Sequence, residues 1–258
     1  MGVANHDVEL LQLGKEKKMR KKNVWKKGMC LILTALLGIQ CFTANGLVAV
    51  KAEETQNTEE VKEEVLEIAT LAEFKAFAER VNKGETFEGK TVRLVSDIAF
   101  DGVTVNNFKP IGDESHPFKG NFDGGGHSIS GMIMVEKTGV LFYKISSATV
   151  QNLILKDCEF DTSDSASGIT CYAENSKIEN CKIEGNSVLK GVKEAAGIVG
   201  YSTGSQIKNC SVGGNTICSN SRKGNNSSND YVSRAAGIVC TAEKSSIINC
   251  NIIKVTKI

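Results

Sequence analysis

The chain has 258 residues, among them 31 Lys and Arg, 30 Asp and Glu, 25 Gly, 9 Cys and only 2 Pro. This length is enough for one sizeable hydrophobic core. The formal net charge is +1, but basic residues gather near the N-terminus and the rest of the chain is mildly acidic. Such a balance argues against nucleic acid as a partner.

The first 52 residues have the layout of a secretory signal peptide. Residues 15–27 are strongly basic, residues 29–50 are largely apolar, and small or neutral residues before position 53 offer a cleavage site. Met19 begins a more ordinary signal and is the predicted true start. A retained transmembrane anchor is the alternative, although polar residues interrupt the apolar run. We therefore expect a secreted or cell-surface protein that meets the membrane only through the signal peptide, before cleavage.

Cleavage would change the charge of the protein. Removing nine of the 31 basic and three of the 30 acidic residues leaves 22 and 27, a net charge of −5. Residues 53–69 then form a Glu-rich segment with few large apolar side chains, which predicts a solvated linker.

An amphipathic helix is predicted over residues 70–84. Thr70-Leu71-Ala72-Glu73 has the pattern of a capping box, an apolar stripe follows at helical spacing, and Gly84 ends it. Such a helix is suited to close one end of a stack of strands. Beyond it, residues 91–95, 97–98 and 103–105 are expected to be the strands of a first coil.

A repeat dominates the rest of the chain. The stretch AAGIVGYSTGSQIKNC at 195–210 recurs as AAGIVCTAEKSSIINC at 235–250, with weaker copies at 167–181 and 138–153. Equivalent glycines lie 29, 29 and 40 residues apart, at Gly139, Gly168, Gly197 and Gly237. A period of this size is typical of a stacked solenoid.

Each copy favours short strands over helix. β-branched residues occur in runs of three to six between Ser, Asn and Gly. About 29 residues fit one coil of three short strands and three turns, at roughly 3.3 Å per strand residue. The predicted fold is an all-β parallel β-helix over residues 85–258, capped by the helix at its N-terminal end.

Two columns of repeated side chains are expected to be structural. Asparagine tolerates left-handed backbone and bonds across turns, so an internal ladder is predicted from equivalent positions, and a row of ligand-binding amides is the alternative: Asn152, Asn180, Asn209 and Asn249. Cysteines replace leucine at one strand position and are expected to be buried, reduced thiols and not disulfides: Cys181, Cys210 and Cys250. No Cys-x-x-Cys spacing or nearby His suggests a metal.

The N-terminal part of the solenoid carries a motif with a known relative. The run Phe118-x-Gly-x-Phe-Asp-Gly-x-Gly-His-x-Ile-x-Gly131, after Pro110-Ile-Gly, resembles a bacterial family of secreted β-helical proteins, and Gly197-Ile-Val-Gly200 resembles its GLUG motif. The resemblance covers residues 70–252 and implies a right-handed parallel β-helix, displayed or shed at the cell surface in adhesin-like proteins. It implies no catalytic residues.

No catalytic residue, metal or cofactor is predicted. Asp123, Gly124 and His127 lie in a Gly-rich turn, where Asp123 is expected to form an Asx turn and His127 to begin a strand; an acid–base pair or half a metal site is the alternative. A second alternative is a polysaccharide lyase, for which clustered acids lie near Lys156: Asp157, Glu159, Asp161 and Asp164.

The last repeat interval contains an eleven-residue insertion, which we place in a loop at 219–231. Insertions in solenoids lie in loops on one face, often the binding face. The candidate binding residues are polar, with one tyrosine that closes the loop: Asn220, Arg222, Lys223, Asn225, Asn226, Asn229, Asp230 and Tyr231.

The predicted function is a non-enzymatic, adhesin-like module that binds a glycan or a protein on a surface. Besides the lyase, the alternative is a structural stalk truncated from a larger surface protein. The sequence stops after residues 252–258 without a recognisable capping element, which predicts a truncated product or end-to-end self-association through the last coil.

Overall fold

The computed structural model describes residues 64–214, 217–220 and 234–253. They belong to one compact unit, residues 60–258. The predicted signal peptide and the first part of the predicted linker lie outside the described residues. Among the described residues, no helix is long and apolar enough to cross a membrane.

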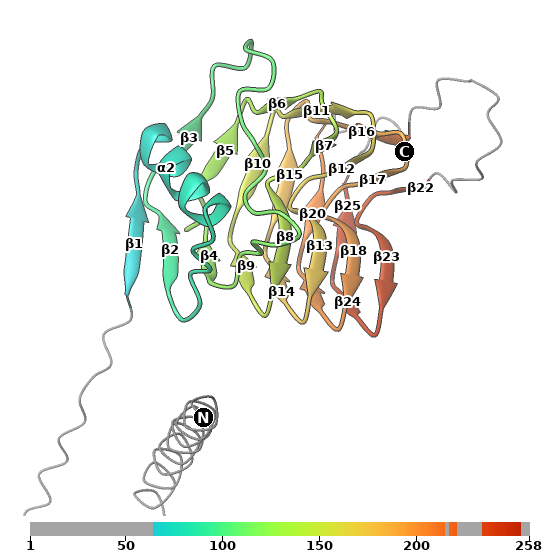
Figure 1. The fold of residues 1–258 in the computed structure, drawn as a ribbon. Helices are drawn as coiled ribbons and strands as arrows, with labels where there is room; N and C mark the ends of the chain where they lie inside the picture. Colours follow the sequence, from blue (N-terminus) through green and yellow to red (C-terminus); the bar gives the residue numbers. More distant parts are fainter. Residues whose placement is uncertain (1–63, 215–216, 221–233, 254–258) are drawn as a thin grey trace, which may run out of the picture. The chain divides into compact units, whose positions relative to one another are not determined.

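The chain winds into successive coils, and equivalent strands of successive coils stack side by side (Figure 1). Every strand pairing within these sheets is parallel. The central buried column of sheet A joins Val150 to Ile178, Ile178 to Ile207 and Ile207 to Ile247. The prediction of a parallel β-helix is confirmed.

Each regular coil passes in turn through five sheets, named A, B, D, E and C. Sheet A contains β1 (Val65–Ile68), β2 (Thr91–Leu94), β4 (Asn121–Asp123), β9 (Thr149–Gln151), β14 (Lys177–Glu179), β19 (Gln206–Lys208) and β24 (Ser246–Ile248). Sheet B contains β3 (Ile98–Ala99), β5 (Ser128–Ser130), β10 (Ile154–Lys156), β15 (Lys182–Glu184), β20 (Ser211–Val212) and β25 (Asn251–Ile252).

The other three sheets have four strands each. Sheet D contains β6 (Ile133–Met134), β11 (Glu159–Thr162), β16 (Val188–Gly191) and β21 (Ile217–Asn220). Sheet E contains β7 (Thr138–Gly139), β12 (Ser165–Ser167), β17 (Glu194–Ala196) and β22 (Arg234–Ala236). Sheet C contains β8 (Phe142–Ser146), β13 (Thr170–Glu174), β18 (Val199–Thr203) and β23 (Val239–Glu243).

The expectation of three strands in each coil was therefore wrong, because five short strands of two to five residues are present. The chain turns too often for longer strands. Between sheets C and A, one residue of every coil adopts a left-handed backbone: Ser147, Asn175, Gly204 and Lys244. A second left-handed column separates sheets A and B and consists of the four predicted asparagines, with φ between 52° and 54°.

The N-terminal end is closed by α2 (Leu71–Asn82) and β1. Thr70 is the N-cap: its hydroxyl accepts from the backbone N–H of Glu73 at 3.2 Å, and the Glu73 carboxylate accepts from the N–H of Thr70 at 3.0 Å. The buried face of α2 packs into an aromatic cluster. The ring centroid of Phe77, on α2, lies 5.1 Å from that of Phe87 and 5.8 Å from that of Phe122.

Two local predictions near this end were wrong. Val65–Ile68, placed in the solvated linker, forms β1, because its backbone pairs with β2 and Ile68 is fully buried in the core. Residues 103–105, expected to be a strand, form a turn with exposed valines. The cause is Asp101, whose carboxylate accepts hydrogen bonds from the backbone N–H groups of Val103 and Thr104.

The last described coil is less covered than the others. Ile247 is 47% exposed, whereas its column partner Ile207 is fully buried. Residues 254–258, which follow this coil, lie outside the described residues.

Candidate binding surface

The predicted binding loop cannot be placed. Asn220 is the last residue of β21, and the other candidates lie outside the described residues: Arg222, Lys223, Asn225, Asn226, Asn229, Asp230 and Tyr231. The loop joins sheet D to sheet E, because β21 precedes it and β22 follows it. Its role in binding stays a prediction.

The acids of the lyase hypothesis are held apart from one another. Asp157 accepts a hydrogen bond from the backbone N–H of Asn186 at 2.8 Å. Asp161 lies 3.6 Å from Lys190, and Asp164 lies 3.0 Å from Lys193. Asp157, Asp161 and Asp164 are thus each engaged by a different residue of the next coil. Within the described part of the chain, no three His, Cys, Asp or Glu side chains group closely enough to hold a metal ion.

Asp123 takes part in the turn chemistry of sheet A. It ends β4 and accepts from the backbone N–H of Gly125 at 3.0 Å and from the Asn152 amide at 3.0 Å. Burial alone would raise its pKa, but these hydrogen bonds and the charge of Arg93, 3.5 Å away, lower the pKa below its usual value. The side-chain contact of His127 is with Asp97, at 3.4 Å, so Asp123 and His127 have separate partners.

The asparagines form a hydrogen-bonded ladder between coils. Asn180 donates to the amide oxygen of Asn152 at 3.1 Å, and Asn209 donates to that of Asn180 at 3.2 Å. Asn249 shares their left-handed backbone conformation. The amide groups of Asn152, Asn180 and Asn209 are therefore used within the fold, and Asp123 continues the ladder at its N-terminal end.

The cysteine column lies inside the solenoid. Cys181 and Cys210 are fully buried, and Cys250 in the last coil is half-buried. These three, with Cys158, Cys171 and Cys240, are free thiols. Burial raises the pKa of Cys171 to about 12 and that of Cys158 to about 11. The Cys158 and Cys171 thiols are therefore poor nucleophiles and poor metal ligands at neutral pH.

The most distinctive outer surface is a row of three tyrosines on sheet C. Tyr172 and Tyr201 are register partners on β13 and β18; the partner of Tyr172 on β8 is Lys144, and Tyr143 is the residue before it. The ring centroids of Tyr143 and Tyr172 are 5.5 Å apart, and those of Tyr172 and Tyr201 are 6.4 Å apart. All three side chains are half-buried, while the adjacent strand residues Phe142, Ala173 and Ser202 are buried. We call this row the tyrosine ladder.

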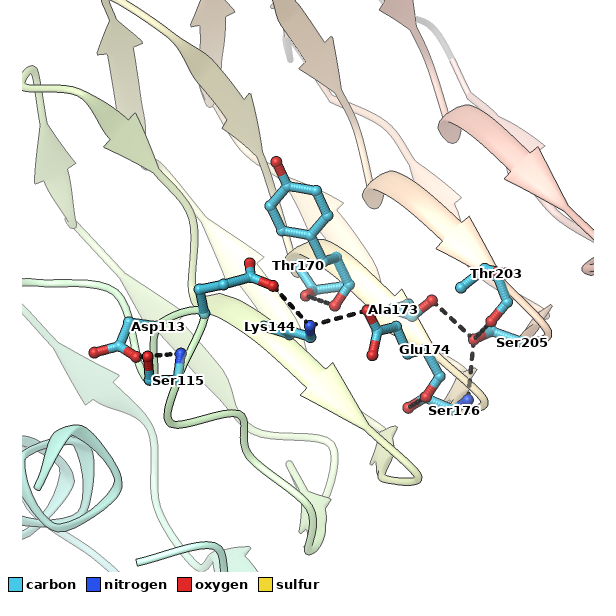
Figure 2. Close-up of polar contacts among 11 residues, drawn as sticks. Asp113, Ser115, Lys144, Thr170, Ala173, Glu174, Ser176, Thr203 and Ser205 are labelled. Atoms are coloured by element: carbon cyan, nitrogen blue, oxygen red, sulfur yellow. Dashed lines mark hydrogen bonds and ion pairs between the residues drawn. The ribbon is translucent and has the colours of Figure 1, made fainter. Parts of the chain in front are cut away.

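Ion pairs across three coils surround Lys144, the register partner of Tyr172 on β8. The ammonium group of Lys144 lies 3.0 Å from Glu114 and 2.9 Å from Glu174, and the Lys144 side chain is only 13% exposed (Figure 2). Hydrogen bonds with Glu174 and Glu114 raise the pKa of Lys144. Glu114 belongs to the segment between Ile111 and Phe118, which adds a preceding layer to sheet C through bridges to β8.

Sheet E supplies one border of the tyrosine ladder. Arg234 lies 3.3 Å from Glu194 and donates to the hydroxyl of Thr241 at 2.9 Å. Thr241 occupies the place after Tyr201 in the same column. The ladder therefore ends at a hydroxyl group held by an arginine.

The tyrosine hydroxyls lie in an acidic environment. Burial, with weaker contributions from Cys171 and from nearby acids that include Glu114 and Asp164, raises the pKa of Tyr143. Burial, with weaker contributions that include Glu194 and Asp164, raises that of Tyr172 to about 12. A hydrogen bond with Glu243 is the main cause of the raised pKa of Tyr201. All three rings are therefore neutral hydrogen-bonding phenols at physiological pH.

The sequence analysis missed the tyrosine ladder, although a signal was present. Tyr143, Tyr172 and Tyr201 are three of the four tyrosines in the chain and are spaced 29 and 29 residues apart, like the glycines. The spacing alone predicts one column, but the register pairs Tyr172 with Lys144, so Tyr143 lies one residue off that column. Whether that column faced the core or the solvent depended on the strand boundaries within each coil, which the period does not give.

Sheet A carries a second, wholly polar outer surface. A shallow hollow of about 410 Å³ crosses β2, β4, β9 and β14, and its lining consists of Thr91, Arg93, Asn121, Asp123, Thr149, Gln151, Lys177 and Glu179. It contains no aromatic side chain, and its Asp123 is already engaged by Arg93 and the asparagine ladder.

Comparison with known proteins adds only a distant likeness. No family model matches the chain, so its resemblance to GLUG-type proteins stays a prediction. No curated protein matches it either. A crystal structure of "a putative immunoglobulin A1 protease from Bacteroides ovatus" is similar over 73% of this chain and 76% of that chain, at 15% identity and a TM-score of 0.40. At this level no activity can be inferred from the likeness.

Proposed function

We propose that this chain is a binding module that turns over no substrate, and that it recognises a glycan or a protein at a surface. The observation that carries the proposal is the tyrosine ladder. Half-buried tyrosines combine an apolar ring with a polar tip and are enriched at binding sites. A parallel β-helix holds them at fixed spacing, which limits the conformational entropy lost on binding.

The lyase alternative has less support from the geometry. A general base needs a partner within hydrogen-bond reach and a tuned pKa. Asp161 and Asp164 instead pair with separate lysines of the next coil. Substitution Asp161→Asn should therefore leave the behaviour of the protein toward polyuronides unchanged.

The exported chain tests this proposal in two parallel assays. It is applied to an array of host and plant glycans and surface proteins, and incubated with polygalacturonate while unsaturated products are followed by absorbance. We expect saturable binding to at least one array component and no product. Product formation that Asp161→Asn abolishes would replace the binding module with an enzyme. A variant lacking residues 220–231 tests the loop, and unchanged binding would remove it from the binding site.

Export is part of the proposal because a surface ligand is reached only outside the cell. We place the cleavage after Ala52, on the charge and apolar pattern of the first 52 residues. N-terminal sequencing of the protein from the medium or cell envelope should begin at Glu53. Recovery of the uncleaved chain in the cytoplasm alone would contradict this assignment.

A further inference from the structure

The outer face of sheet C has the chemistry of a carbohydrate platform. We propose that the tyrosine ladder binds an uncharged, extended polysaccharide of β-linked hexoses that runs along the β-helix axis, one sugar ring over each tyrosine. This inference rests on the proposed binding function and names its ligand class.

The spacing of the ladder supports an extended chain. Successive coils of a parallel β-helix are separated by about 4.8 Å, and the ring centroids follow at 5.5 and 6.4 Å. An extended β-linked hexose chain advances by a similar length with each ring. Tyr143, Tyr172 and Tyr201 therefore lie at a spacing that suits three consecutive sugars, with each ring tilted by 53° from the next.

The tyrosine rings suit the C–H groups of a sugar, and the polar groups around them suit its hydroxyls. The C–H groups on one side of a pyranose ring carry partial positive charge, which the negative face of a tyrosine ring attracts. The hydroxyls of Tyr143 and Tyr172 have no hydrogen-bond partner among the described residues and are free to bond sugar hydroxyls. Carboxylates around the ladder, Glu174 and Glu194, provide acceptors.

The charge around the ladder selects against acidic ligands. Six carboxylates influence the tyrosine hydroxyls: Asp113, Glu114, Asp164, Glu174, Glu194 and Glu243. The nearby cations are each within 3.3 Å of one of these acids: Lys144, Lys193 and Arg234. No positive charge is left in excess to receive a uronate, sulfate or phosphate. A peptide ligand would bring no repeat that matches the coil spacing.

The test is calorimetric titration of the exported chain with three probes: the β-1,4-linked glucose hexamer, the glucose dimer as a length control, and polygalacturonate as the acidic control. We expect the hexamer to bind, the dimer to bind more weakly because it covers fewer rings, and polygalacturonate not to bind. Tyr172→Ala should weaken hexamer binding at least about ten-fold, since the central stacking partner is lost.

Two variants separate recognition from folding. Tyr172→Phe keeps the ring and should retain most of the hexamer affinity, whereas Gln206→Ala on the outer face of sheet A should leave it unchanged. Urea unfolding checks that each variant is folded. The ladder is overturned as a glycan site if the hexamer does not bind, if Tyr172→Ala binds it normally, or if polygalacturonate binds better.

The outcomes also distinguish this inference from the proposed function. Binding of another array component that depends on residues 220–231 and not on Tyr172 would refute the tyrosine platform and leave a binding module. Failure of every array component would refute both.

Discussion

The first coils and the regular coils of this solenoid are stabilised in different ways. Up to β8, the core is filled by phenylalanines in edge and stacked contacts, with α2 laid over them. From β9 to β20, the core is built mainly of columns of small or aliphatic residues, such as Val150, Ile178 and Ile207, with Phe160 as an exception. The irregular end depends on a few large side chains, and the regular part on many small, equivalent contacts.

The largest expected effect is on the aromatic cluster. Phe77→Ala should lower the free energy of unfolding by about 3–5 kcal/mol, because a cavity replaces a fully buried ring. The Phe77 ring contacts four others, at centroid distances of 5.1–6.3 Å. Urea unfolding followed by circular dichroism measures the change.

Phe160→Ala is the matched control in a regular coil. Phe160 is also fully buried, but it makes no ring–ring contact among the described residues. Phe160→Ala should lower the free energy of unfolding by less than Phe77→Ala does. Equal losses would mean that the aromatic cluster adds nothing beyond the burial of each ring.

The next effect concerns the asparagine ladder. Asn180→Ala puts a residue that tolerates left-handed backbone less well at φ 54° and removes two hydrogen bonds, to Asn152 and from Asn209. We expect the free energy of unfolding to fall by about 2 kcal/mol. Asn180→Gly removes the same bonds without the conformational strain and should cost about 1 kcal/mol. If the two variants lose equal stability, the left-handed preference of asparagine contributes nothing here.

A smaller effect is expected at the helix that closes the first coils. Thr70→Ala removes the hydroxyl that caps α2 and should cost about 1 kcal/mol in a thermal or urea unfolding experiment. Thr70→Ser keeps the oxygen and should restore most of the loss. If Thr70→Ser lost as much stability as Thr70→Ala, the capping role would be contradicted.

The smallest predicted effect depends on pH. The folded-state pKa of Asp123 is below its ordinary value of 3.8, so this carboxylate stabilises the fold above that value, and the contribution is lost as pH falls through the lower folded pKa. Asp123→Asn should therefore be less stable than the parent at about pH 7 and approach it at about pH 3. A difference that is independent of pH would exclude a role for the charge.

The sequence was sufficient for the parts of the fold that repeat. The 29-residue interval predicted which residues stack between β14 and β19, but Gly139 pairs with Ala166 and not with the predicted Gly168. The asparagines and the capping box of Thr70 and Glu73 were visible as short motifs. Five strands in each coil were not predicted, because the cross-section depends on backbone dihedral angles at the corners. β1 was missed because four residues at the end of an acidic segment form a strand only where β2 offers an edge.

The candidate site was likewise only partly predictable from the sequence. Sequence reasoning chose the insertion because it breaks the period, and it overlooked the tyrosines because they obey the period. Tyr172 occupies a position whose strand neighbour Ala173 is buried, and only the strand boundaries show which of the two faces solvent. A periodic aromatic residue therefore needs the coil geometry before its role can be assigned.

The corner between sheets D and E has a practical consequence. The interval from Gly197 to Gly237 is eleven residues longer than the others, yet Ala195 still pairs with Ala235 and Val199 with Val239. Extra chain at this corner leaves the flanking strands in register. The equivalent corner of the preceding coil, between Gly191 and Glu194, should therefore accept a grafted peptide, which would turn the solenoid into a scaffold for epitope display.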